Sequence, residues 1–249
     1  MYQFFIEDEN AAEDFVTIEG SDVNHIKNVL RMKPGEKIRV CTRNGQNYFC
    51  SISDITESFV RADILEKEAE STELPCRIYL FQGLPKNDKM EWIIQKTVEL
   101  GVYEVIPVAM KNCVVKLDDK KAKSKVMRWQ AIAESAAKQS KRSLIPEVKM
   151  PMSYKEAVAY AKELDVKLVH YENEHGMAGT KAAMEQIKKG ESIAVFIGPE
   201  GGFAPEEIAL VQDEMQLISL GKRILRTETA GIAALAILGY QLESSDMIE

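Results

Sequence analysis

The chain has 249 residues, of which 45% are hydrophobic and 29% are charged, and its formal net charge is -7 at pH 7. That length and composition are typical of a globular protein with one large domain or two modest ones. The four cysteines are widely scattered, with no C-x-x-C pair and no histidines at metal-ligand spacing, so we expect reduced thiols and no bound metal.

The N-terminal sequence MYQFFIEDENAAEDF is acidic and lacks the basic and apolar regions of a secretory signal. No uninterrupted apolar run approaches membrane-spanning length. We therefore expect a cytoplasmic protein without a membrane anchor.

The charge is distributed unevenly along the chain. Residues 111–149 hold eleven Lys or Arg against four Asp or Glu, a local excess of +7 inside an acidic protein. Because phosphate contacts depend on local charge, this segment is suited to face RNA. A solvated, lysine-rich helix face is the alternative, and composition does not choose between them.

Residues 1–70 are predicted to form a small β domain. A short helix that ends at Pro34-Gly35 is followed by three short alternating segments, which we expect to be strands. These segments are 36–42, 47–53 and 58–66. Asn44-Gly45 is typical of a hairpin turn between the first two, so we expect an antiparallel barrel or sheet. The acidic stretch 66–75 indicates a linker.

From residue 75 to residue 249, strand and helix patterns alternate, which predicts an α/β domain with a mostly parallel, doubly wound sheet. The expected strands are 77–84, 104–110, 166–172, 192–198 and 217–221. The expected helices are 87–101 (capped by Asp88), 120–140, 154–164, 180–190, 205–215 and 229–242. The last of these is apolar nearly all round, so we expect it in the core or at a dimer interface.

The stretch VFIGPEGGFAPEE, residues 195–207, passes from an apolar strand through three glycines into a helix. Ligands of open α/β sheets bind at such strand ends. The glycine spacing matches neither a P-loop nor G-x-G-x-x-G, and Glu206 and Glu207 at the helix start disfavour phosphate. We therefore expect a neutral or cationic ligand, with a plain strand-to-helix turn as the alternative.

The stretch LGKRILRTETAG, residues 220–231, also follows a strand and leads into a helix. Arg223 and Arg226 lie three residues apart, and an arginine here is suited to stabilise negative charge on a heterocycle or a phosphate. An exposed, capped helix start is the alternative. Two such loops at neighbouring strand ends favour one shared pocket.

The histidines His25, His170 and His175 show neither a metal triad nor a nucleophile pattern. We expect ordinary surface or core roles for them. Nothing in the sequence supports hydrolytic nucleophile chemistry.

Five stretches carry a family resemblance: HIKNVLRMKPGEKI, KMEWIIQKTVELGV, RWQAIAESAAKQSKRSLIPEV, FIGPEGGFAPEEI and LGKRILRTETA. In this order they resemble the signatures of the ribosomal small-subunit RNA methyltransferase E family, over about residues 25–241. One departure is Gln3, which stands before Phe4-Phe5 where the family often has a basic residue. An N-terminal arginine contact with RNA is therefore not carried over.

The resemblance implies a SPOUT-class enzyme that uses S-adenosylmethionine to methylate N3 of a uridine in 16S rRNA of the small ribosomal subunit. It also implies a homodimer, a PUA-like RNA-binding barrel at residues 1–70 and a C-terminal trefoil knot. Alternation alone would not predict a knot, because knots are nearly absent from proteins. A SPOUT enzyme for another RNA site and a non-catalytic RNA-binding ribosome assembly factor are the alternatives.

The same resemblance implies that the cofactor lies among three loops, YENE, GPEGG and LGKRILRTETA. The residues expected to bind it are Tyr171, Glu172, Ile197, Gly198, Pro199, Glu200, Gly201, Gly202, Leu220, Gly221, Leu225, Arg226, Thr227, Thr229 and Ala230. From their places in the loops, we expect Arg226 to stabilise the uracil oxygens and Glu200 or Glu228 to accept the N3 proton. The residues expected to contact RNA are Arg31, Lys121, Lys125, Arg128, Lys141 and Arg142.

Overall fold

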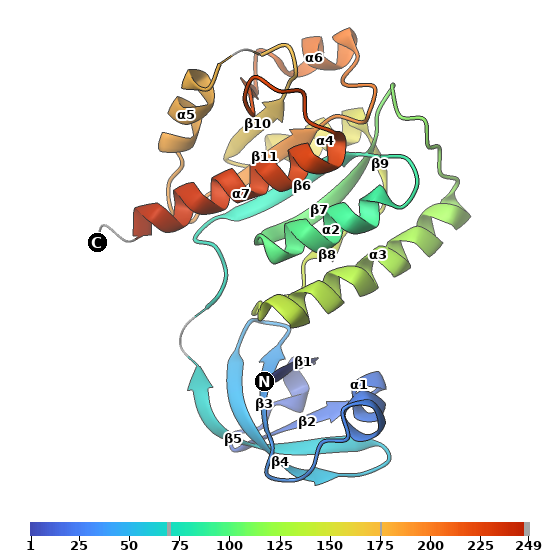
Figure 1. Cartoon of the computed structure of the whole chain (residues 1–249), viewed down its shortest axis with the longest axis vertical. Coiled ribbons are helices and arrows are strands. Elements are labelled where there is room, and N and C mark those ends of the chain that lie inside the picture. The colour runs from blue at the N-terminus through green and yellow to red at the C-terminus, as the bar shows by residue number, and fades with distance from the viewer. Residues whose placement is uncertain (69–70, 175, 247–249) are drawn as a thin grey trace. The chain divides into compact units, whose positions relative to one another are not determined.

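The computed structural model describes residues 1–68, 71–174 and 176–246 (Figure 1). It divides into two compact units. The first contains Met1–Glu73 with Ala137–Ile145, and the second contains Leu74–Ala136 with Pro146–Glu249. Each domain was expected to be one continuous stretch, whereas Ala137–Ile145 belongs to the first unit.

The first unit is built on a five-stranded sheet in the order β1-β3-β4-β5-β2. Its strands are β1 (Tyr2–Ile6), β2 (Phe15–Glu19), β3 (Lys37–Thr42), β4 (Asn47–Ile55) and β5 (Phe59–Glu68). The three strands expected from the sequence, β3, β4 and β5, pair antiparallel as predicted, and β2 pairs antiparallel with β5. The unexpected strand β1 pairs with β3 in parallel. The edge strands β1 and β2 also approach each other, so the sheet curls.

Short helical turns complete this unit: η1 (Asp8–Asn10), α1 (Ser21–Asn24) and a π-helical turn η2 (His25–Val29). Ile26 of η2 is fully buried among the apolar faces of the strands. One short helix was expected here, and neither β1 nor β2 was predicted. Each of these strands is a five-residue segment beside acidic sequence, and the residues of β1 pair with residues 36 positions later.

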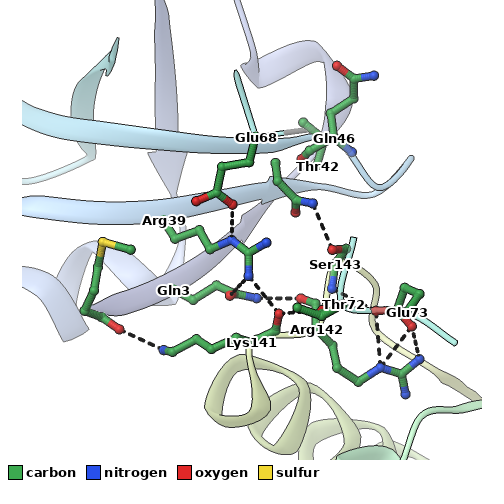
Figure 2. A network of polar contacts seen from close by, with 12 residues as sticks. Gln3, Arg39, Thr42, Gln46, Glu68, Thr72, Glu73, Lys141, Arg142 and Ser143 are labelled. Carbon is green, nitrogen blue, oxygen red and sulfur yellow. Dashed lines mark hydrogen bonds and ion pairs between the residues drawn. The ribbon is translucent and has the colours of Figure 1, made fainter. Parts of the chain in front are cut away.

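A polar network binds Ala137–Ile145 to the strands of the first unit (Figure 2). Arg39 on β3 donates a 2.8 Å hydrogen bond to the backbone carbonyl of Lys141 and forms an ion pair with Glu68. Arg142 forms an ion pair with Glu73, and the whole residue is only 3% exposed. The expectation that Arg142 contacts RNA is therefore wrong, because its guanidinium is buried against a carboxylate.

The second unit has a parallel sheet in the order β12-β10-β11-β6-β7-β8, with β9 beside β7. Its strands are β6 (Arg77–Gly83), β7 (Val102–Ala109), β8 (Glu147–Val148), β9 (Met152–Ser153), β10 (Val166–His170), β11 (Ser192–Ile197) and β12 (Gln216–Ile218). The five strands expected from the sequence are present. The two-residue strands β8 and β9 were not expected, because they are too short for a periodic pattern.

The helices of this unit are α2 (Lys89–Glu99), α3 (Asp119–Ser140), α4 (Tyr154–Lys162), α5 (Ala178–Glu185), α6 (Pro205–Val211) and α7 (Thr227–Asp246). All six were expected from the sequence. Asp88 stands at the N-cap position of α2 but does not cap the helix with its side chain, and instead lies 3.5 Å from the ammonium of Lys125.

Helices cover both faces of the parallel sheet. On one face α7 packs beside α2 and crosses β6 and β11 (Figure 1). On the other face, the rings of Phe81 and Phe196 stack at 4.4 Å and meet Tyr160 and Tyr154 of α4. Successive residues of a strand point to opposite faces, so this arrangement buries all of β11 and every residue of β6 after Arg77.

Candidate active site

Three strand-end loops meet at the carboxyl edge of the parallel sheet. They follow β10, β11 and β12, which are neighbours in the sheet, and they contain YENE, GPEGG and LGKRILRTETA. A cavity of about 960 Å³ lies among them. This is the upper end of the size range of small-molecule sites, and the position is the usual one for ligands of parallel sheets.

The loop after β11 depends on glycine at two places. A Cβ on Gly83, at the end of β6, would lie 2.6 Å from the backbone nitrogen of Pro199, so only glycine lets the loop approach that strand. Gly202 has a φ of +67°, and a Cβ there would lie 3.0 Å from Oε1 of Glu172. Because both positions are glycine, the loop after β11 can lie close to β6 and to the first loop.

The connection between β7 and α3 holds the same loop, and the start of α6, from another direction. The amide of Asn112 donates to the carbonyls of Gly201 and Gly202, at 3.1 and 3.2 Å. The backbone N–H of Lys111 donates to Oε1 of Glu207 at 2.8 Å. The loop is therefore fixed by bonds from outside its own sequence.

The acids at the start of α6 have a structural function. Glu207 accepts a 2.8 Å bond from the backbone N–H of Ala204, which caps the helix, and Glu206 forms an ion pair with Lys111. Neither glutamate lines the cavity. The sequence argument that these two acids select a cationic ligand is therefore corrected, because both carboxylates are engaged elsewhere.

The third loop is joined to the second by Thr227, the first residue of α7. Its hydroxyl donates to the carbonyl of Gly198 at 2.6 Å and accepts from the amide of Gln82 at 2.8 Å. Further back, the hydroxyl of Thr180 donates to the carbonyl of Ser219 at 2.8 Å. A shared pocket was expected from the sequence, and the bond between Thr227 and Gly198 joins its two principal loops.

Lys89, the first residue of α2, forms an ionic connection between the same loops. Its ammonium lies 3.1 Å from Oε1 of Glu200 and 3.1 Å from Oε2 of Glu228. Oε1 of Glu200 also accepts a 3.0 Å bond from the backbone N–H of Lys86. Partial burial raises the pKa of Glu200, whereas the backbone N–H groups of Lys86 and Glu200 and the ammonium of Lys89 lower it. The lowering effects are larger together, so the pKa lies below its usual value.

The first loop brings a histidine and a carboxylate to the cavity. His170, the last residue of β10, lines it, and burial lowers the pKa of this imidazole below its usual value. Glu172 also lines it, and no cation in the described part of the chain pairs with this carboxylate. His170 was expected to have an ordinary surface or core role, and its place in the cavity wall is a difference. His175 lies outside the described residues.

Cations gather along the third loop. Lys222, Arg223 and Arg226 all line the cavity and are exposed, and none has an acidic partner within the described residues. Ile224 lies among them and is 85% exposed. This wall is suited to a negatively charged group at the mouth of the cavity.

Twelve of the fifteen predicted cofactor residues line the cavity: Tyr171, Glu172, Ile197, Gly198, Pro199, Glu200, Gly202, Gly221, Leu225, Arg226, Thr227 and Ala230. Gly201, Leu220 and Thr229 do not. Of the expected catalytic residues, Arg226 and Glu200 line it, whereas Glu228 lies behind Lys89. Arg223, singled out beside Arg226 in the sequence, lines the cavity as well, and the lining residues that were not expected are Lys89, His170, Asn173, Gly176, Phe203, Ser219, Lys222 and Ile224.

Some of the missed residues had a local signal and others had none. Lys222 and Ile224 stand inside the LGKRILRTETA stretch, so their sequence neighbours pointed to them. Lys89 comes from the start of a helix more than 100 residues before the glutamates that it meets. Only the packing of α2 beside α7 brings it to the cavity.

The basic residues expected to contact RNA from α3 are paired on their own unit. Lys121 lies 3.2 Å from Asp118, Lys125 lies 3.5 Å from Asp88, and Arg128 lies 2.8 Å from Glu91. All three pairs are at the surface, where ion pairs contribute little free energy. These cations could therefore leave a carboxylate to bind a phosphate. The role of these side chains in RNA binding stays a prediction.

Two further expected RNA contacts lie in the first unit. Arg31 is exposed, whereas Lys141 is half-buried and its ammonium donates to the carbonyl of Met1 at 2.8 Å. Over the described ranges no cluster of three or more His, Cys, Asp or Glu is placed to hold a metal ion. None of the described helices is long and apolar enough to cross a membrane.

The cavity combines apolar walls with carboxylates on one side and cations on another. Ile197, Leu225 and Ala230 supply apolar surface, and Glu172 and Glu200 supply negative charge. Gly198 and Gly202 of the glycine turn also line the cavity. Such a site fits an elongated organic molecule that carries both positive and negative groups.

Comparison with known proteins assigns this arrangement to a class. The family model described as an RNA methyltransferase domain matches residues 72–239, and the model described as an RNA methyltransferase PUA domain matches residues 18–65. The parallel sheet with its cavity is thus an RNA methyltransferase domain, and the curled sheet is of the PUA type.

Proteins that are similar over nearly the whole chain identify the family within this class. A curated ribosomal RNA small subunit methyltransferase E of Bacillus subtilis is 39% identical, with 98% of each chain covered. The chain belongs to the ribosomal RNA small subunit methyltransferase E family. A crystal structure of a member from Neisseria gonorrhoeae, bound to S-adenosyl methionine, is 32% identical, with a TM-score of 0.84 and coverage of 96% and 97%. A methyltransferase structure from Legionella pneumophila in complex with the bound cofactor SAM is 30% identical, with a TM-score of 0.83 and the same coverage.

Proposed function

We propose that the protein transfers a methyl group from S-adenosylmethionine to N3 of a uridine in 16S rRNA of the small ribosomal subunit. The observation that carries this proposal is the cavity formed by the three strand-end loops, with GPEGG and LGKRILRTETA bonded to each other through Thr227. Similar full-length chains that carry the rRNA methyltransferase name, and similar structures with the cofactor bound, support it.

The residues present fit S-adenosylmethionine. This cofactor has no phosphate, and the glycine turn offers no lysine of the P-loop kind. Ile197 and Leu225 would pack against its adenine, and the backbone of Gly198 and Gly202 would lie along it, with Glu172 on the side that faces its positive groups. When bound, it supplies a methyl group on a positively charged sulfur.

The chain's part in the reaction is mainly positioning. A bond forms between uridine N3 and the methyl carbon while the carbon–sulfur bond breaks, and the N3 proton passes to an acceptor. Two firmly held loops that fix both reactants in line would supply much of the acceleration. Loss of the N3 proton leaves negative charge on the uracil oxygens, and Arg226, exposed at the cavity, is suited to stabilise it.

Binding of the RNA and association of two chains are also part of the proposed function. We propose that the PUA-type unit and the basic residues Arg31, Lys121, Lys125, Arg128 and Lys141 hold rRNA. We also propose a cytoplasmic homodimer whose C-terminal segment forms a trefoil knot. The exposed Trp92 on α2 and Tyr240 on α7 support a second copy as partner, because these two helices pack side by side.

The test of this function separates binding from chemistry. Calorimetry should show S-adenosylmethionine binding to the wild type and to Arg226→Ala with similar affinity, because other residues hold the cofactor. Methyl transfer to 16S rRNA should fall by about 10²–10³-fold in Arg226→Ala and recover in part in Arg226→Lys. Normal turnover of Arg226→Ala would contradict the role of this arginine, and absence of cofactor binding to the wild type would favour a non-catalytic assembly factor.

A further inference from the structure

We propose that Lys89 is a positioning residue that joins the second and third cavity loops, and that Glu200 and Glu228 are its anchors rather than acceptors of the N3 proton. This inference rests on the proposed methyl transfer for its meaning in catalysis. Its structural part stands on contacts within the second unit alone.

Three segments that are far apart in the sequence meet at the Lys89 ammonium. Glu200 belongs to the GPEGG loop, Glu228 to the first turn of α7, and Lys89 itself to the first turn of α2. Both nitrogen–oxygen distances are 3.1 Å. The ammonium thus bridges the two loops from the helix that packs beside α7.

The environment makes this bridge stronger than a surface ion pair. The side chains of Lys89, Glu200 and Glu228 are 27%, 23% and 18% exposed. The Glu228 carboxylate raises the pKa of Lys89, burial lowers it, and Glu200 raises it further. The pKa therefore lies above its usual value, and the ammonium stays charged at neutral pH. Partial burial reduces screening of the pairs, and one cation holds two carboxylates in place.

A second connection runs parallel to the first and has a different character. Gln82, Thr227 and Gly198 are joined by neutral hydrogen bonds in the interior of the unit. Lys89 joins the same two loops through the residues that follow, Glu200 and Glu228. Two adjacent connections fix both the separation and the orientation of the loops, which one hydrogen bond could not do.

The same contacts make the two glutamates poorly suited to act as the base. A general base must lie within reach of the proton, and its pKa must be near the working pH. Glu200 is bonded by Lys86 and Lys89, and its pKa is lowered. Glu228 faces Lys89 and does not line the cavity.

The experiment uses the full chain in four variants: Lys89→Met, Lys89→Arg, Glu228→Gln and the control Lys96→Met. Lys96 lies on the same helix, is 28% exposed and pairs with Glu99 away from the cavity. Urea unfolding first confirms that each variant is folded. Cofactor affinity, kcat, KM and the pH profile of kcat are then measured, together with hydrogen exchange of the Gly202 and Ala230 amides without cofactor.

We expect Lys89→Met to weaken S-adenosylmethionine binding about tenfold and to speed exchange at Gly202 and Ala230, whose N–H groups bond within the two loops. Lys89→Arg should retain most of the affinity, and Lys96→Met should match the wild type. Glu228→Gln should change affinity and exchange but leave the shape of the pH profile intact. A merely structural role would not give this rescue by arginine together with an unchanged profile.

Two results would overturn the inference. One is Lys89→Met with wild-type affinity and exchange. The other is Glu228→Gln, or Glu200→Gln, that keeps cofactor affinity but loses turnover and one limb of the pH profile, which would identify that glutamate as the base. If the wild type binds no cofactor at all, the proposed function fails, while the exchange rates of the unliganded variants still test the connection.

Discussion

The hydroxyl of Thr227 lies 2.6 Å from the carbonyl oxygen of Gly198, and this single hydrogen bond joins two loops separated by a helix and a strand in the sequence. The same hydroxyl accepts from Gln82, which is fully buried. Thr227 therefore connects the end of β6, the turn after β11 and the start of α7. The cavity keeps its form through this connection and through Lys89.

Replacing Thr227 by valine should loosen the cavity. Valine keeps the shape but removes the hydroxyl, which leaves the Gly198 carbonyl without its donor, and we expect a loss of about 1–3 kcal/mol in the free energy of unfolding. Cofactor affinity should fall as well. Urea unfolding and calorimetry measure the two effects, with Thr227→Ser as the control that keeps the hydroxyl. Equal stability and affinity of Thr227→Val and the wild type would show that the bond contributes nothing.

Arg142→Met should destabilise the first unit by about 3–5 kcal/mol, because it leaves the carboxylate of Glu73 without its buried partner. The matched control is Arg43→Met, which breaks an exposed pair with Glu7 and should cost at most about 1 kcal/mol. Urea unfolding followed by a probe in the first unit measures both. If Arg142→Met kept its stability but bound RNA weakly, Arg142 would contact RNA, which would contradict its structural role.

Neutralising Lys121, Lys125 and Arg128 together should weaken rRNA binding and reduce its dependence on salt. Each cation that meets a phosphate contributes about 0.7 to the slope of log affinity against log salt for single-stranded nucleic acid, so we expect the slope to fall by about 2. The control replaces Lys96, Lys162 and Lys181, which also pair with glutamates. An unchanged slope would place the RNA elsewhere.

His170 should make the protein less stable in mild acid. Burial lowers the pKa of this imidazole in the folded state, so the unfolded chain binds the proton more readily as the pH falls through about 6.5. The free energy of unfolding should therefore decline from pH 7 to pH 5 more steeply in the wild type than in His170→Gln. His25→Gln, at an exposed site, is the control. Parallel curves for the wild type and His170→Gln would contradict this account.

The sequence predicted the parallel sheet and the two principal loops because both have local signals. Six helices have clear apolar faces or caps, and the loops contain glycines directly after buried strands. The pairing of β1 with β3 had no such signal, since it joins residues that are 36 positions apart. The same holds for Asn112 and Lys89, which reach the GPEGG loop from other parts of the chain.

Charge was the least reliable guide, because sequence shows which side chains are ionic and not which partners they have. Arg142 counted toward the basic segment, yet Glu73 from the expected linker neutralises it in the interior. Glu206 and Glu207 suggested a cationic ligand, yet they hold Lys111 and cap α6. The negative charge that does line the cavity comes from Glu172 in the first loop and Glu200 in the second.

The most direct test of the central claim is mass mapping of modified nucleosides in 16S rRNA from cells that lack this gene. We expect one N3-methyluridine to be absent, to return with the wild-type chain and to stay absent with Arg226→Ala. An rRNA whose N3-methyluridine is unchanged by the deletion would contradict the assignment of this reaction to the protein.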